Sequence, residues 1–139
     1  METSKTLGIL AAVIGGVIGS QVARNLFRPD VKSAAFLGKA AAEVNKKCPM
    51  MIDAETEMSH AEGLEGVFVY NYRLVKMSAS EVDGAQLQAA LQPQVTKLAC
   101  TTPQTRDTFL KQGIAMRYTY ADKDRVPIAT FDVIAADCK

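Results

Sequence analysis

The sequence predicts an α+β protein in which an N-terminal transmembrane helix is followed by an antiparallel four-stranded sheet with helices packed on one face. Three observations predict this fold class. The stretch Thr6–Ala23 contains no charged residue. Four later segments alternate apolar and polar residues with the two-residue period of a β-strand. They form two pairs around a stretch with helical periodicity, and strands grouped in hairpins favour an antiparallel sheet.

The division expected from these patterns is a membrane anchor at 1–28, a linker helix at 29–47 and an α+β domain at 48–139. As an α-helix, the apolar stretch rises about 27 Å, close to the ~30 Å hydrocarbon core of a bilayer. A cleavable secretory signal has a similar pattern, with Lys5 ahead of an apolar run. We favour an uncleaved anchor because the run is longer than that of a usual signal and matches a cleavage site poorly.

Small residues recur along the apolar stretch at spacings that suit helix packing in lipid. Gly8, Ala12, Gly15 and Gly19 are the candidate helix–helix packing residues. Such spacings let two helix backbones approach closely, so this face would bind another envelope protein or a second copy of the chain. Small residues are also common in membrane and signal segments that make no such contact, and that alternative stays open.

The segment after the anchor is expected to be helical. Pro29 ends the first helix, and Asp30 is a candidate N-cap for a second helix with the sequence VKSAAFLGKAAAEVNKK. Its lysines suit anionic lipid headgroups, but a solvated linker helix is the favoured interpretation. Cys48 and Pro49 end this helix.

Two strands are predicted next. The polar sequence EMSHAEGLEG predicts an edge strand within 54–66 that ends in a turn. The clearest strand follows, with the sequence GVFVYNYRLVK. Tyr70 and Tyr72 fall on one of its faces, while Val69 and Asn71 fall on the other.

Helices and a second hairpin complete the domain. Asp83 is expected to cap a helix in which Pro93 predicts a kink or a division into two. A short helix beginning at Thr102-Pro103 should end at Gly113. Two strands, at 114–120 and 128–134, then flank a turn, and we expect Asp132 to pair with Arg117 across them.

The three cysteines bear on the compartment. Cys100 ends the long helix and Cys138 follows the last strand, so a sheet packed on that helix would bring the two together. Two buried thiols in a cytosolic protein are the alternative that the residues leave open. Neither cysteine has a zinc-ligand spacing with Cys48, which is expected to be free or to bridge two protomers.

Orientation in the membrane is predicted differently by the charges and by the cysteines. Arg24, Arg28 and Lys32 follow the apolar stretch, so the positive-inside rule alone would leave the domain in the cytoplasm. A Cys100–Cys138 pair would instead need an oxidising compartment. We therefore expect a single-pass inner-membrane protein whose C-terminal domain is periplasmic.

Motifs for catalysis, metals and nucleic acids are missing from the sequence. His60 is the only histidine, which excludes metal motifs with two histidines. No serine lies in G-x-S-x-G and no glycine-rich phosphate loop follows a strand. The net charge of +1 provides no basic field for nucleic acid. We expect no catalytic residues, no cofactor, no metal and no nucleic-acid partner.

Four tyrosines form the candidate recognition surface. Tyr70, Tyr72, Tyr118 and Tyr120 occur as Y-x-Y pairs on two predicted strands. They would form an aromatic groove for a peptide or a glycan. The alternative is that the rings form the packed face of the sheet.

Several stretches within 45–138 resemble known proteins. They are NKKCPMMID with a following ET, VYNYRLV, LAC continuing to LKQGIAMRYTY, and ATFDVIAADC. They resemble a family of small bacterial proteins of uncharacterised function that have a membrane-targeting start and an exported domain. More weakly, they resemble the disulfide-bonded α/β pilotins of type II secretion, which escort secretin subunits but carry a lipid anchor. The resemblance implies that Cys100 and Cys138 pair and that the domain is exported, and it implies no activity.

Together these observations predict a membrane-anchored periplasmic domain that binds another protein as a non-catalytic accessory of a cell-envelope assembly. One alternative is a hydrolase of envelope polymers that uses surface carboxylates such as Asp53 or Glu55. The other is a solute-sensing domain that signals through the helix.

Overall fold

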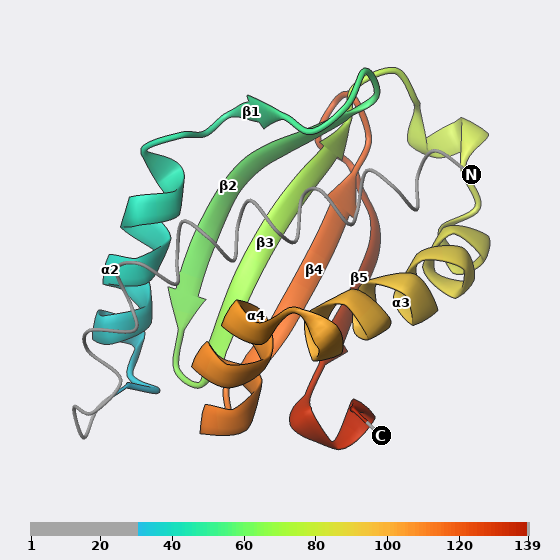
Figure 1. Ribbon diagram of the computed structural model, residues 1–139. Coiled ribbons are helices and arrows are strands. Elements are labelled where there is room, and N and C mark those ends of the chain that lie inside the picture. The colour runs from blue at the N-terminus through green and yellow to red at the C-terminus, as the bar shows by residue number, and fades with distance from the viewer. Residues whose placement is uncertain (1–30, 139) are drawn as a thin grey trace.

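The computed structural model describes residues 31–138 of the protein (Figure 1). In chain order the elements are α2 (Ala34–Asn45), β1 (Met50–Met51), β2 (Thr56–Leu64), β3 (Val67–Leu74), α3 (Gly84–Thr101), α4 (Pro103–Thr108), β4 (Ala115–Ala121) and β5 (Pro127–Val133). The predicted anchor lies outside these residues, as do its packing residues Gly8, Ala12, Gly15 and Gly19. Within 31–138, no helix has the length and apolar character needed to cross a membrane.

The sheet is mixed and five-stranded, in the order β1-β2-β3-β4-β5, so the prediction of four antiparallel strands is wrong. β1 adds a short edge strand, which makes β2 an inner strand. β3 and β4 are parallel, with Val67 opposite Ala115. The cause is the long connection between them, because α3 and α4 return the chain to the end of the sheet where β3 begins. There the Ala115 N–H donates to the Gly66 carbonyl at 2.9 Å.

The helices pack on one face of the sheet, as the sequence predicts: α2 over β2, and α3 over β5 (Figure 1). α2 begins after Ser33, whose hydroxyl accepts the Phe36 N–H at 3.1 Å. The segment expected to be a linker helix therefore supplies α2, and α2 contributes Leu37 and Val44 to the core.

α3 begins as predicted but is not divided at Pro93. The Asp83 carboxylate accepts the N–H groups of Ala85 and Gln86 at 2.9 and 3.2 Å. The helix then runs unbroken through Pro93 to Thr101, so the predicted division is wrong. Pro93 lies on the exposed side of α3, where water can bind the carbonyl that loses its partner.

The turn between β4 and β5 is organised by one buried carboxylate. Asp122 is 2% exposed. Its oxygens accept N–H groups from Ala79, Asp124 and Val126 at 2.8 Å each. These bonds, led by that from Val126, hold the pKa of Asp122 below its usual value, so the side chain is ionised near neutral pH. The same turn fixes Arg125, which has φ of 69°.

Candidate functional site

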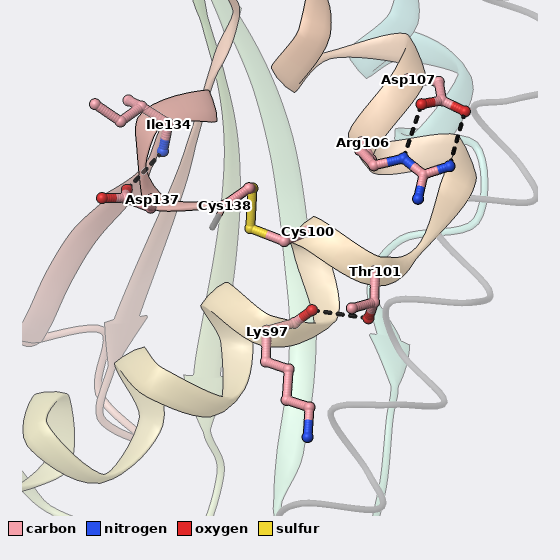
Figure 2. The surroundings of a disulfide bond; sticks show 8 residues. All are labelled: Lys97, Cys100, Thr101, Arg106, Asp107, Ile134, Asp137 and Cys138. Atoms are coloured by element: carbon pink, nitrogen blue, oxygen red, sulfur yellow. Dashed lines mark hydrogen bonds and ion pairs between the residues drawn. A yellow bond between two sulfur atoms is a disulfide. The ribbon is translucent and has the colours of Figure 1, made fainter.

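A disulfide joins the helical layer to the end of the sheet. Cys100 in the last turn of α3 is bonded to Cys138, with sulfurs 2.00 Å and Cα atoms 5.4 Å apart (Figure 2). The short turn that presents Cys138 is closed by the Asp137 carboxylate, which accepts the Ile134 N–H at 2.9 Å (Figure 2). The bond therefore ties α3 to the segment that follows β5, and it is the pairing that the resemblance implied.

Cys48 is the free cysteine of the domain. It is half-buried after α2, and its thiol donates to the Val44 carbonyl at 3.5 Å. Burial and the nearby Glu57 carboxylate raise the pKa of the thiol. Cys48 is therefore protonated near neutral pH and is a poor nucleophile.

The tyrosines of the predicted recognition surface lie in the core. Tyr70, Tyr72, Tyr118 and Tyr120 are each 8% exposed or less. Their rings pack against one another across β3 and β4 in tilted pairs, with centroids 5.1 Å apart for Tyr72 and Tyr120 and 5.6 Å apart for Tyr70 and Tyr118. The packed alternative is therefore the observed one, because these rings carry the largest apolar area of their strands.

Burial also makes these phenols chemically inert. It raises the pKa of all four tyrosines. The hydroxyls of Tyr70 and Tyr120 are buried without a hydrogen-bond partner. None of the four is therefore a proton donor or nucleophile near neutral pH.

Comparison with solved structures identifies the fold. A candidate secreted protein of Pseudomonas aeruginosa superposes with a TM-score of 0.68 at 18% identity, over 79% of this chain and 96% of that chain. The pilotin EpsS of the Vibrio vulnificus type 2 secretion system gives 0.62 at 14% identity, and the type II secretion pilotin AspS of Vibrio cholerae gives 0.57 at 14%. Each of these pilotin matches covers 86% of this chain and 97% of the pilotin. This chain and the two pilotins share one fold.

The predicted similarity to pilotins is thus confirmed for the fold, and at 14% identity it concerns the fold alone. No protein-family model matches the sequence, and no curated protein sequence matches it. The pilotin-like fold therefore supplies the architecture, and any site must be derived from the residues of this chain.

The hydrolase alternative needs a second carboxylate that meets Asp53 or Glu55. Both of these residues precede β2, whereas Asp132 lies on β5. Asp53 closes the turn before β2, where it accepts the N–H groups of Glu55 and Thr56 at 2.7 and 2.6 Å. The carboxylate of Asp132 accepts a hydrogen bond from the Arg117 guanidinium at 2.8 Å. The predicted pair of Arg117 and Asp132 is therefore confirmed. β3 and β4 separate the two carboxylates, which do not converge as an acid–base pair requires.

The sheet face opposite the helices, called the open face below, is polar and contains a groove. Rows of side chains cross it, and the pairing registers of the strands decide which residues share a row. The middle row joins His60, Asn71, Thr119 and Thr130, and the row beside it contains Glu57, Arg73, Ala121 and Pro127. A groove of about 340 Å³ is lined by the residues of these two rows other than Glu57, and also by Ser59 and Arg125.

Sequence reasoning missed this groove. Its floor residues Asn71, Thr119 and Thr130 lie on β3, β4 and β5 and become neighbours only through register. The signal available in the sequence was the alternation along β3, which places Asn71 on the face of the strand away from Tyr70 and Tyr72. Alternation shows which residues of one strand share a face. Which residues of other strands lie beside them depends on the order and register of the strands.

Proposed function

We propose that this protein is a non-catalytic accessory domain of a cell-envelope assembly, exported from the cytoplasm and held at the inner membrane by its N-terminal segment. One observation carries the proposal: a disulfide-bonded domain has the fold of a candidate secreted protein and of two secretion pilotins. Disulfides of this kind persist in oxidising compartments such as the periplasm. The apolar stretch Thr6–Ala23 supports the same location.

A binding role accounts for the chemistry of the described residues better than catalysis does. The tyrosines are buried with raised pKa values, and the thiol of Cys48 is protonated. Asp132 is held by Arg117. A general acid or base needs a group whose pKa lies near the working pH and that reaches a substrate.

The partner is proposed to be another envelope protein that adds an extended segment to β5. β5 is the last strand of the sheet, so no described strand pairs with its outer edge, and the start of α3 lies against the backbone of Ile128 near the beginning of the strand. Exposed apolar side chains flank it, Val126 at 46% exposure before the strand and Ile134 at 45% after it. Addition of an extended peptide to an exposed edge strand is a common mode of recognition. Backbone hydrogen bonds then extend the sheet, and apolar side chains beside the edge add contacts.

Photo-crosslinking in cells tests this function. We expect a photoreactive residue at Val126 or Ile134 to capture the same envelope protein, because both positions flank the β5 edge. Leu64 is the matched control, since it is an exposed aliphatic residue at 42% exposure on the far side of the sheet. Capture of the same proteins from all three positions, or of none from the β5 positions, would contradict the proposal.

A further inference from the structure

The groove on the open face has the size of a small-molecule site. Its volume of about 340 Å³ lies within the usual range of ligand sites, about 300–1,000 Å³. It is hollow because Ala121 presents only a methyl group between Arg73 and Pro127 in its row. The helices occupy the opposite face, so the described residues leave this side of the sheet open to solvent.

The floor of the groove is a connected set of hydrogen-bonding groups. The Thr119 hydroxyl donates to the Asn71 amide oxygen. The Asn71 amide nitrogen donates to Glu62 at 3.0 Å and contacts the His60 ring nitrogen at 3.3 Å. Thr130 continues the row as an exposed residue opposite Thr119. This row presents oriented donors and acceptors, which suit a ligand whose hydroxyls both donate and accept.

One wall of the groove is cationic. Arg73 is held by Glu57, with its Nε donating at 3.0 Å, and by the Lys123 carbonyl at 2.8 Å. Arg125 stands beside it, and its charge helps to lower the pKa of Glu57. Within 31–138 the exposed Arg125 guanidinium makes no hydrogen bond and no ion pair. Its positive φ of 69° is unusual for a residue other than glycine, and such conformations cluster at ligand sites.

The cation of the groove that is open to a ligand is Arg125. Arg73 is paired with Glu57, whereas the guanidinium of Arg125 has no ion-pair partner among residues 31–138. A single carboxylate fits the guanidinium fork in a bidentate manner. A more highly charged phosphate would also face Glu57 and Glu62, and a neutral sugar would leave Arg125 unpaired.

We propose that this groove binds a carboxylate-bearing sugar, with the carboxylate on Arg125 and the hydroxyls over Asn71, Thr119 and Thr130. This site is additional to the β5 edge. Ligand binding in the groove does not require that the β5 edge binds a protein.

Titration of the full-length protein with D-glucuronate, followed by NMR or calorimetry, tests the site. We expect shifts of the amide signals of Asn71, Thr119, Thr130 and Arg125, and binding at least about tenfold tighter than that of D-glucose or acetate, because neither probe makes both sets of contacts. Acetate that binds as tightly as glucuronate would overturn the assignment to a sugar. Shifts confined to other parts of the chain would overturn the site.

Variants separate the site from general charge effects. Arg125→Gly removes the guanidinium and suits the positive φ, so the fold should be kept while glucuronate binding weakens about tenfold or more. Thr119→Val removes the hydroxyl that donates to Asn71 and should also weaken binding. Arg106→Gln is the control, because Arg106 lies on α4 and pairs with Asp107. Equal affinity in Arg125→Gly and Arg106→Gln would overturn the proposal.

Discussion

Replacing Cys100 and Cys138 together by serine is expected to lower the free energy of unfolding by about 4 kcal/mol. The bond joins residues separated by 38 positions, and closing a loop of that length removes much of the conformational freedom of the unfolded chain. A domain of this size has a total stability of about 5–15 kcal/mol, so the loss is a large share of it. Urea denaturation of the oxidised wild type and of the double variant measures the difference.

Cys48→Ser is the matched control for this experiment. Cys48 is half-buried and forms no disulfide, and serine can keep its hydrogen bond to the Val44 carbonyl, so we expect a change below about 1 kcal/mol. Reduction of the wild type should reproduce the effect of the double variant. Equal stability of the wild type and the double variant would show that the bond does not constrain the domain.

Gly63→Ala is expected to destabilise the protein by about 3 kcal/mol, because it separates α2 from the sheet. A Cβ atom at Gly63 would lie 2.1 Å from the Leu37 carbonyl carbon and 2.3 Å from the Gly38 nitrogen. Both are backbone atoms of α2, so no side-chain rotation relieves the clash. The helix must shift, which exposes part of the apolar surface that Leu37 and Val44 bury. Thermal and urea denaturation measure the loss.

Gly38→Ala is the control from the other side of the same contact. A Cβ atom there meets nothing within 4 Å, and the position lies inside α2. Alanine has the higher helix propensity, so we expect a gain of about 0.5–1 kcal/mol. If both substitutions stabilise the protein, α2 does not dock on β2 through Gly63.

Local patterns predicted the elements whose structure is set locally. Alternation identified β3, β4 and β5, and the short side chain of Asp83 identified the start of α3. The parallel pairing of β3 with β4 depends on where the helical connection returns the chain, which no local pattern contains. β1 has only two residues, Met50 and Met51, too few for a period to be visible.

The candidate sites were harder to predict than the fold because burial decides them. Alternation placed Tyr70 and Tyr72 on one face of β3 and Asn71 on the other, without stating which face the helices cover. The helices cover the tyrosines, so the polar face became the open one. The role of Arg125 arises from the turn held by Asp122, a buried carboxylate that the sequence does not distinguish from its exposed neighbours.

Thiol trapping in intact cells tests the exported location most directly. The protein has three cysteines, and the proposal places two of them in a disulfide formed outside the cytoplasm. Cells are quenched with acid, and the full-length protein is alkylated without reductant and weighed by mass spectrometry. We predict one modified thiol, on Cys48, and three after reduction. Three modified thiols without reductant would contradict the account.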